Sequence, residues 1–518
     1  MRIISAFLAV MALSCGAAAA EVPQTIHGRV FLNSNANGRL DPGEHGIPGV
    51  RVTDGVNFVT TGEDGSYTIK LAADPSFKFR PAQTIAVCWP SGKWPTSKHW
   101  VRLLDIKDAQ AVNFGLRDDK QSLPFMYLQQ SDSHCRFPGR CDEFAAFVNR
   151  LGSEVKFVLD TGDTSFGPEG KDGRTTFRVL TEAEKKFKVP FLHAIGNHDV
   201  MPEGDEELAG FAAWTRDLGP LRWSFDYADV HFAAIDCFEE EMRPVVVDWL
   251  EKDFKAQPKG RRIVLCHHYP NPDGDKFHAL LKDYNVQLVN AGHNHASKFW
   301  DDWYAPMVTV FDYKPLGNCN AMVVTPAGVS PAYYCLGCKG KPFVHSRRCP
   351  INWESGVLLT SVQKLFGKEV RVENQTLSGA AEPIAVSTTK ILIQARIDPG
   401  TSKRVGLRLG SSQTPVEIAF TGDHLVIAGA PLRFDIKQAD KLLRLTVFVQ
   451  KGMVAVWADE YFFMEKRIPP AGGPITAFAE GGAATIKTMT VTGIKPDPAN
   501  SEAAYHNNDV GGPRRTPD

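Results

Sequence analysis

Histidine and aspartate residues gather in one stretch of this chain. Nine of its fifteen histidines lie between residues 132 and 295. Five short motifs there combine carboxylate, imidazole and amide side chains: DSH at 132–134, GD at 162–163, GNHD at 196–199, HHYP at 267–270 and GHNH at 292–295. Such donors suit borderline divalent metals, whereas calcium prefers oxygen ligands alone. Because two such ions about 3.5–4 Å apart can hold a phosphate oxygen and activate a hydroxide, the motifs predict phosphoester chemistry.

Each motif follows an apolar run that is typical of a buried strand. The runs lie at residues 125–128, 155–159, 194–195, 263–265 and 286–289. From Pro124 onwards such runs alternate with amphipathic helical patterns, which indicates a layered α/β core. Ligand sites in open α/β sheets gather at the carboxyl ends of the strands. We therefore expect the five motifs to meet in one crevice.

The order of the motifs, D-x-H, G-D, G-N-H-D, H and G-H-x-H, resembles that of the calcineurin-like metallophosphoesterase family over residues 122–335. The resemblance implies a four-layer αββα sandwich that binds two divalent metal ions, with Mn, Fe, Zn and Co all compatible with the ligand types. It also implies hydrolysis of a phosphomonoester or phosphodiester by attack of a metal-bridging hydroxide. Purple acid phosphatases have an iron-binding tyrosine where this chain has Phe166, so no tyrosinate-to-iron colour is expected.

Carried over position by position, the resemblance assigns the metal ligands. It places Asp132, His134 and His295 on the first ion and Asp163 between both ions. The second ion would be completed by Asn197, His293 and one of two adjacent histidines.

The adjacent histidines are His267 and His268. The family form His-x-Pro selects His268, because Pro270 follows it two places later. A shift of one residue in strand register would exchange the two side chains, so both are candidate ligands.

His198 follows the ligand Asn197 and is the candidate general acid for the leaving alkoxide. Asp199 is its candidate orienting partner. The alternative role for His198 is a hydrogen bond to the phosphate without proton transfer.

The rest of the chain divides into segments that differ in their pattern of apolar and polar residues. Short strands separated by turn residues predict an N-terminal β-sandwich over residues 21–120. The phosphoesterase domain is placed at 121–350, and alternating apolar residues predict a C-terminal β-sandwich at 351–495. The polar segment 496–518 is expected to be a disordered tail.

The two flanking segments carry resemblances of their own. GIPGVRV at 46–52 and EDGSY at 63–67 resemble the repeat-type β-sandwich modules of bacterial surface proteins. Residues 442–491, with VAVW at 454–457, loosely resemble the C-terminal sandwich of fructan-hydrolysing glycosidases. That resemblance implies a cell-surface glycan as a candidate partner.

A loop from Asn33 to Glu44 has oxygen-bearing side chains at the spacing of a calcium loop, with Gly38 at the turn. Asparagine takes the place of the usual aspartate at the first position, which weakens the attraction for a cation. Calcium binding and a plain hydrogen-bonded turn both fit this pattern.

Residues 1–20 predict a signal peptide, with Arg2 before a short apolar run and small residues at 18–20 for cleavage. The protein is therefore expected to be exported to the periplasm or the extracellular space, and lipid attachment at Cys15 is disfavoured. In such a compartment Cys135 and Cys141 fit a disulfide. Disulfides or a structural zinc site both fit Cys335, Cys338 and Cys349.

The charge balance argues against a dedicated nucleic-acid binder, because 58 Lys and Arg residues oppose 59 Asp and Glu residues for a net charge of -1. After the leader, no segment is long and apolar enough to predict a transmembrane helix. The predicted function is an exported dimetal phosphoesterase acting on a phosphoester substrate. The alternative is a surface glycan-binding protein with an inactive phosphoesterase-like domain.

Overall fold

The computed structural model describes most of the chain between residues 22 and 494. The described residues are 22–77, 79–134, 142, 144–146, 148–149, 152–164, 173–200, 211–236, 243–270, 272, 274–294, 298–300, 307–309, 318–325, 328–335, 351–352, 357–358, 366–385, 390–410, 415–427, 429–433, 436, 439–450, 453–458, 461–467 and 474–494. The predicted signal peptide with Cys15, the predicted tail, His295, Phe166 and five further cysteines (Cys135, Cys141, Cys237, Cys338, Cys349) lie outside these ranges.

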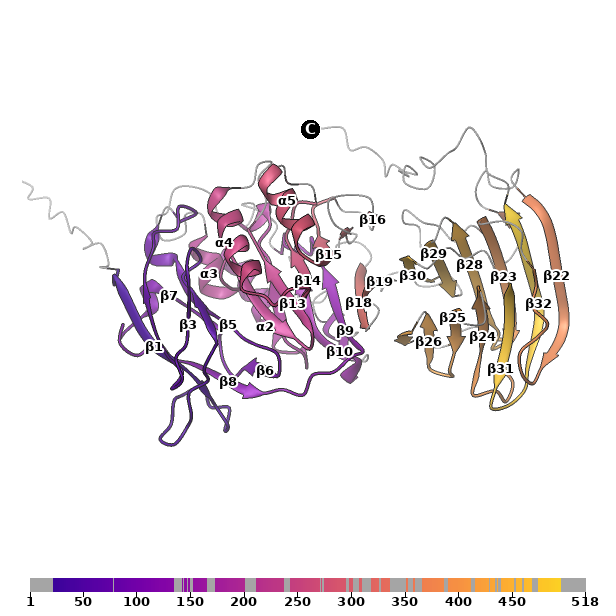
Figure 1. Cartoon of the computed structure of the whole chain (residues 1–518), viewed down its shortest axis with the longest axis horizontal. Helices are drawn as coiled ribbons and strands as arrows, with labels where there is room; N and C mark the ends of the chain where they lie inside the picture. Colours follow the sequence, from indigo (N-terminus) through magenta and orange to yellow (C-terminus); the bar gives the residue numbers. More distant parts are fainter. Residues whose placement is uncertain are drawn as a thin grey trace, which may run out of the picture.

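The chain is a sheet-rich, multidomain protein whose regions follow one another along the long axis of the molecule (Figure 1). Its first region contains two four-stranded sheets, in the orders β4-β1-β8-β6 and β3-β2-β5-β7. The strands are β1 (Thr25–Leu32), β2 (Arg51–Thr53), β3 (Phe58–Thr60), β4 (Ser66–Lys70), β5 (Thr84–Cys88), β6 (Lys93–Pro95), β7 (Trp100–Arg102) and β8 (Phe114–Asp118). Alternate residues of β4, such as Tyr67 and Ile69, are buried, as one-sided strands require.

The central region contains a five-stranded sheet of order β11-β10-β9-β18-β19 and a six-stranded sheet of order β12-β13-β14-β15-β17-β16. The strands are β9 (Phe125–Gln130), β10 (Val155–Asp160), β11 (Phe191–His193), β12 (Trp223–Tyr227), β13 (Val230–Ala234), β14 (Arg262–Cys266), β15 (Val286–Ala291), β16 (Lys298–Trp300), β17 (Met307–Thr309), β18 (Asn318–Thr325) and β19 (Gly328–Cys335).

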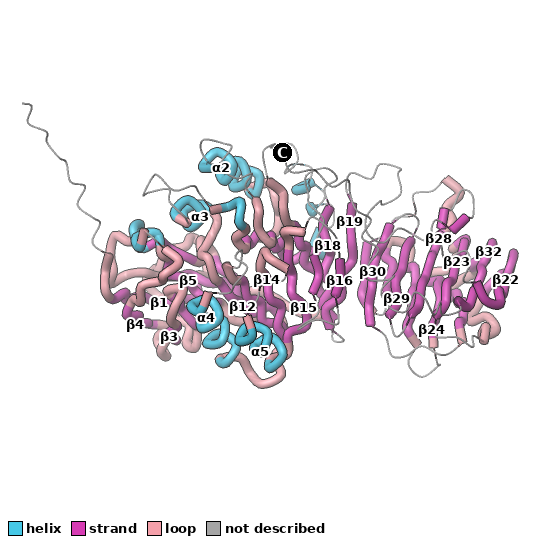
Figure 2. The backbone as a smooth tube through the Cα atoms, turned by 90° about the horizontal axis from the view of Figure 1, so that it is seen from above, coloured by secondary structure: helices cyan, strands magenta, loops and turns pink. Residues whose placement is uncertain are grey.

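An apolar core joins the facing sides of these two sheets. Phe157 of the first sheet packs its ring 5.3 Å from that of Phe232 and 5.5 Å from that of Phe225, both in the second sheet. Helices α4 (Pro244–Lys255) and α5 (Asp275–Asp283) lie on one side of the strands, and α2 (Gly173–Glu184) and α3 (Ala212–Asp217) on the other (Figure 2). Trp249 and Phe277 anchor α4 and α5 in a core with strands β13 to β15.

The direction of the central strands sets where the site lies. β9, β10 and β11 run parallel to one another, as do β13, β14 and β15. Parallel strands bring all their carboxyl ends to one edge of the sheet, and the predicted motifs follow these ends. Among the described residues no helix is both long and apolar enough to cross a membrane.

The C-terminal region contains a six-stranded sheet, β22-β32-β23-β28-β29-β30, and a five-stranded sheet, β27-β26-β25-β24-β31. Leu443, Leu445, Val447 and Val449 of β28 are all buried, as expected for alternating apolar residues on one side of a strand, and Thr446 between them is buried too. The strands are β22 (Phe366–Leu377), β23 (Lys390–Asp398), β24 (Arg404–Leu409), β25 (Val416–Phe420), β26 (His424–Ile427), β27 (Ala430–Arg433), β28 (Leu443–Gln450), β29 (Met453–Ala458), β30 (Tyr461–Arg467), β31 (Ile475–Glu480) and β32 (Ala484–Ile494), with a short pair β20 (Ile351–Asn352) and β21 (Val357–Leu358) before them.

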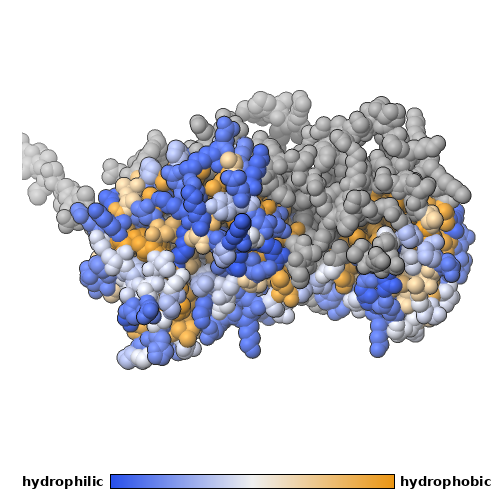
Figure 3. All heavy atoms as spheres, in the orientation of Figure 1, coloured by the Kyte–Doolittle hydropathy of each residue, from blue (hydrophilic) through white to orange (hydrophobic). Residues whose placement is uncertain are grey.

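Buried polar contacts join the first region to the central one. Arg51 of β2 donates to the Asp253 carboxylate of α4 over 2.5 Å, and Arg222 pairs with Asp74. The Trp249 indole donates to the Thr53 hydroxyl over 3.0 Å. Hydrophilic residues cover much of the visible surface around the central helices, with smaller apolar patches between them (Figure 3).

Candidate metal centre

Loops at one edge of the two central sheets present the predicted ligands. Asp132 and His134 follow β9, Asp163 follows β10, and Asn197 opens the 3₁₀ turn η5 (Asn197–Asp199) after β11. The second sheet contributes His268 after β14 and His293 after β15. Every described motif therefore reaches the same edge, as the strand-end argument predicts.

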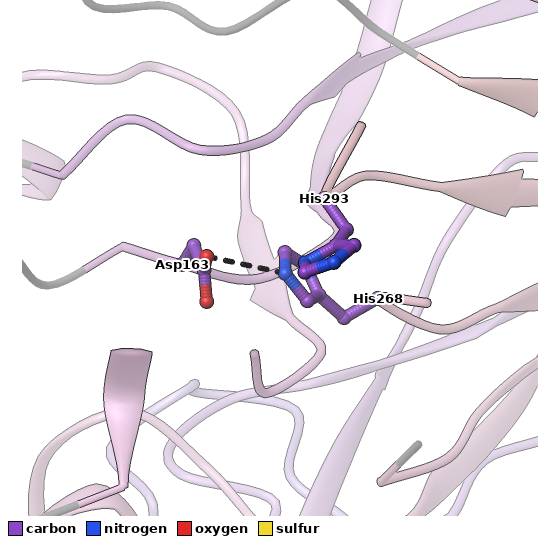
Figure 4. Close-up of side chains that lie close together, drawn as sticks. All are labelled: Asp163, His268 and His293. Atoms are coloured by element: carbon purple, nitrogen blue, oxygen red, sulfur yellow. Dashed lines mark ion pairs between the residues drawn. The ribbon is translucent and has the colours of Figure 1, made fainter. Parts of the chain in front are cut away.

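These side chains form two groups that share one carboxylate. Asp132, His134 and Asp163 each offer a ligand atom within 4.8 Å of the others, and so do Asp163, His268 and His293. Figure 4 shows the second group, in which both imidazoles approach the Asp163 carboxylate. We call the five residues the metal-site cluster. Two adjacent cation sites with a common carboxylate are the arrangement that a binuclear centre needs.

Four residues of the cluster have a backbone conformation that is rare outside glycine. The φ angles of Asp132, His134, Asp163 and His293 are 52°, 40°, 55° and 66°. Residues in such conformations concentrate at functional sites, because the surrounding structure must hold them there. Here the Asp132 amide donates to the Gly162 carbonyl over 2.9 Å, and the His134 amide to the Asp163 carbonyl over 3.0 Å.

Two glycines let the loops approach the ligands closely. A Cβ atom on Gly196 would lie 2.2 Å from Asp163 Oδ1, and one on Gly292 would lie 1.9 Å from Ser131 Oγ. Any side chain at either position would therefore displace the loop that carries an aspartate of the cluster.

Asp163 is the centre of the network. Its Oδ1 accepts a hydrogen bond from the His198 amide over 2.9 Å, and its Oδ2 lies 3.2 Å from His268 Nε2 and 3.9 Å from His134 Nε2. Burial alone would raise the pKa of this carboxyl, but the neighbouring His268 outweighs burial and holds it well below its usual value. The Asp163 carboxylate is thus ionised and ready to bind a cation.

The structure separates the two adjacent histidines. His268 Nδ1 lies 2.8 Å from the Thr161 carbonyl and donates a hydrogen bond to it. This bond turns Nε2 towards Asp163, the arrangement typical of a ligating imidazole. Burial disfavours the charged imidazole, but Asp163 outweighs burial and raises the pKa of His268 to about 9. The His267 ring lies instead 5.9 Å from that of Phe277 in α5, and burial lowers its pKa to about 3.

Asn197 gives a direct test of whether the residues fit a metal ion. Its Oδ1 is buried and has no hydrogen-bond partner in the described part of the chain. Buried carbonyl oxygens are nearly always partnered, and an amide oxygen is a suitable ligand for Mn, Fe, Zn or Co. The donor set therefore fits a metal ion at this position.

His198 is the exposed member of the site. Its side chain is 47% exposed, and its Nε2 lies 3.9 Å from Asp163 Oδ2. Asp199, by contrast, is buried and accepts hydrogen bonds from the Thr164 hydroxyl over 2.8 Å and from the Gly196 amide over 2.9 Å. These two bonds of Asp199 support the loop that presents Asn197 and His198.

A second layer of polar residues holds the Asp163 loop. Asp160 accepts from the Gly162 amide over 3.1 Å and lies 3.2 Å from His193 Nδ1, whose Nε2 lies 2.7 Å from Glu184. Burial disfavours the charged imidazole, but Glu184 and Asp160 outweigh burial and raise the pKa of His193 to about 10. Sequence patterns alone do not point to the Thr161 carbonyl or to Glu184. A backbone carbonyl has no residue signature, and Glu184 reaches His193 only through the packing of α2.

The loop from Asn33 to Glu44 closes on its own hydrogen bonds. Asn35 and Asn37 donate to Asp41 Oδ2 over 2.8 and 2.7 Å, and Glu44 accepts from the Ser34 and Asp41 amides. Calcium binding at this loop stays a prediction. Elsewhere the described cysteines Cys88, Cys266 and Cys319 are free thiols in buried positions.

Comparison with known families identifies the central region. Residues 126–297 match the family described as "Calcineurin-like phosphoesterase". This stretch contains all five motifs, so the chain carries a calcineurin-like phosphoesterase domain. No curated protein matches the chain.

Solved structures show partial likenesses. Purple acid phosphatase PPD1 from yellow lupin (Lupinus luteus) is 10% identical, with 57% of this chain and 70% of that chain covered and a TM-score of 0.33. GAP50 of Plasmodium, described as an anchor in the inner membrane complex, is 14% identical, with 42% and 87% covered and a TM-score of 0.32. Fructosyltransferase from A. japonicus is 18% identical, with 24% and 26% covered and a TM-score of 0.22. The chain thus spans about a quarter of the fructosyltransferase.

Proposed function

We propose that this protein is an exported phosphoric ester hydrolase that works with two divalent metal ions. The observation that carries the proposal is the pair of Asp/His groups that share Asp163. The phosphoesterase domain at residues 126–297 supports the same chemistry.

Seven side chains would hold the ions. Asp132, His134 and His295 would bind one, Asn197, His268 and His293 the other, and Asp163 would contact both. His268 is preferred over His267 because its Nε2 lies 3.2 Å from Asp163 Oδ2, whereas the His267 ring packs on α5. Bound there, the ions would activate a hydroxide and draw charge from the phosphoryl oxygen.

His198 would supply the proton for the departing alkoxide. It is the half-exposed imidazole at the rim of the cluster, and its backbone amide is bonded to Asp163, so the ring position is tied to that of the bridging carboxylate. Asp199 would act by holding this loop through Thr164 and Gly196, rather than by touching the substrate. A general acid at this point contributes about 10²–10⁴-fold.

The remaining regions enter the proposal as modules around the hydrolase. We take residues 121–350 as a four-layer αββα domain, 21–120 and 351–495 as β-sandwiches, and 1–20 as the export signal. The two stacked central sheets with helices on both outer sides support this layering. A cell-surface glycan on the C-terminal sandwich is the candidate partner.

Metal removal tests the proposal. The full chain is assayed with nitrophenyl phosphate and bis(nitrophenyl) phosphate before and after exhaustive chelation, with metal content measured in parallel. Hydrolysis should disappear with the metal and return with added Mn. Turnover that persists with empty sites would overturn the assignment. Hydrolysis of neither ester, combined with glycan retention by the protein, would favour the glycan-binding alternative.

A further inference from the structure

A pocket separate from the metal-site cluster lies between the first region and the central domain. Its volume is about 390 Å³, within the range of about 300–1,000 Å³ that is typical of small-molecule sites. It reaches the amino end of β10 at Val155 and Lys156, and the segment before β11 at Lys188 to Pro190. The metal-site cluster follows the carboxyl end of β10. Since a strand of six residues spans about 20 Å, the two sites are separated by roughly that distance.

Four cationic side chains line this pocket. Arg117 and Lys120 come from the end of β8 and the residues after it, Lys156 from β10, and Lys188 from the segment before β11. Asp119 is the acidic residue of the lining. Four cations against one carboxylate leave a formal charge of +3 (4 − 1) in a chain whose net charge is -1.

These cations differ in their partners from two other cations of the first region. Lys93 and Arg102 nearby form ion pairs with Asp118 and Asp105. Within the described ranges, by contrast, the side chains of Arg117, Lys120 and Lys188 have no ion pair or hydrogen bond, and Lys156 donates to the Ser153 carbonyl over 2.7 Å. The Asp119 carboxylate already accepts from Gln121 over 3.1 Å. In the described part of the chain none of the four cations forms an ion pair with a carboxylate, and Asp119 supplies the one negative charge of the lining.

The wall between the cations is apolar. Trp94, Tyr227 and Pro190 line it together with Val189. Trp94 and Tyr227 are rigid parts of the aromatic core, with ring centroids 6.2 Å apart, so the wall is preformed. An apolar wall inside a group of unneutralised cations favours a ligand that combines a ring with several negative charges over a bare ion.

We propose that this pocket is a second binding site, for a ring-sized organic anion with two or more sulfate, phosphate or carboxylate groups. The ring would lie on the Trp94 and Tyr227 side, and the anionic groups would meet Arg117, Lys120, Lys156 and Lys188. The site is independent of the metal chemistry, because it is about one strand length from the metal ligands.

Benzene-1,3,5-trisulfonate is a suitable probe, since it has the ring and the charges, cannot be hydrolysed at phosphorus and is a poor ligand for metals. Its binding to the metal-loaded full chain is measured by calorimetry at fixed ionic strength, beside benzyl alcohol and inorganic sulfate. We expect one trisulfonate site per chain, with weaker binding of sulfate and none of benzyl alcohol. The double variant Lys120→Gln/Lys188→Gln should bind at least about tenfold more weakly, because two charge-assisted contacts are lost.

The matched control is Lys259→Gln/Lys282→Gln, which removes the same charge from two exposed lysines outside the pocket. It should bind the probe like the parent. Both double variants should keep the parental melting temperature and hydrolysis of nitrophenyl phosphate, so failure of this site and failure of the hydrolase remain distinguishable. Equal loss in both variants, or sulfate binding as tightly as the trisulfonate, would overturn the proposal.

Discussion

The central region contains two buried clusters of aspartate and histidine, which share their residue types but differ in structure. In one, which we call the strand cluster, His231 of β13 lies 2.8 Å from Asp226 and 2.7 Å from Asp253. Arg51 and the Ser224 hydroxyl complete the environment of Asp253. The other is the metal-site cluster around Asp163.

The difference between them lies in the backbone and in the source of positive charge. His231 sits on a regular strand, and the carboxylates around it are neutralised by the protein's own cations, His231, Arg51 and Arg261. Four of the five metal-site residues, all except His268, have positive φ, and three imidazoles converge there on two carboxylates. A cluster that closes on its own cations stabilises the fold, whereas one held in strained loops with several imidazoles is suited to bind a metal.

Removal of a single carboxylate from each cluster should separate the two roles most strongly. Asp163→Asn should reduce hydrolysis to the assay background and lower the bound metal, because the shared ligand is lost. Asp253→Asn should lower the melting temperature by breaking a buried pair, while metal content and turnover of the folded enzyme stay near parental. Metal analysis measures the bound metal, nitrophenyl phosphate assays measure hydrolysis, and thermal melting measures stability. If Asp163→Asn kept both metals and its activity, the metal-site cluster would not differ in function from the strand cluster.

His198→Ala should come next in size. We expect kcat to fall by about 10²–10⁴-fold, as for loss of a general acid, with both metals retained. Activity on a substrate with a good leaving group should fall less, because its alkoxide needs no proton. An equal fall on good and poor leaving groups would assign His198 to phosphate binding instead.

The adjacent histidines give a matched pair within one loop. His268→Ala should remove one metal and lower activity by more than about tenfold, a loss at least as large as for an outer-shell partner of a metal. His267→Ala removes a ring that packs on Phe277, so it should lower stability and leave metal content unchanged. Metal stoichiometry per folded chain decides between them, and the reverse pattern would show that the strand register differs.

The smallest of the expected effects is a pH dependence of the free energy of unfolding, which arises from His231 in the strand cluster. Burial opposes protonation, but Asp253 and Asp226 outweigh it and raise the pKa of His231 to about 9. A raised histidine pKa stabilises the folded state fully below the unfolded value near 6.5 and less as pH rises through 9.

The parent should therefore lose on the order of 1–3 kcal/mol of stability from this group between about pH 6.5 and 9.5. His231→Gln should lack that part of the decline, since glutamine does not titrate. Denaturant unfolding at several pH values measures the free energy of unfolding for both proteins. Parallel curves would mean that His231 is neutral in the folded protein.

Much of the architecture follows from local patterns. The alternating apolar residues Leu443, Leu445, Val447 and Val449 are all buried in strand β28, and the short strands predicted for the first region include β1 at Thr25–Leu32. The apolar runs before the motifs became β9, β10, β14 and β15 because each is short, rich in branched and aromatic residues, and followed by glycine or polar residues. The strand cluster could not be predicted from local patterns, because Arg51 and Asp253 are 202 residues apart in the sequence.

The sequence by itself determined which side chains could bind metal and that they follow the ends of strands. Both can be recognised within short segments, because the residue types show the ligand chemistry and the spacing of apolar residues shows the strands. Only the tertiary structure decided that His268 and not His267 turns towards Asp163, that Asp199 bonds to Thr164 and Gly196, and that four cations from separate segments share one pocket. These outcomes depend on backbone torsions and on packing between distant segments, which no single stretch of residues encodes.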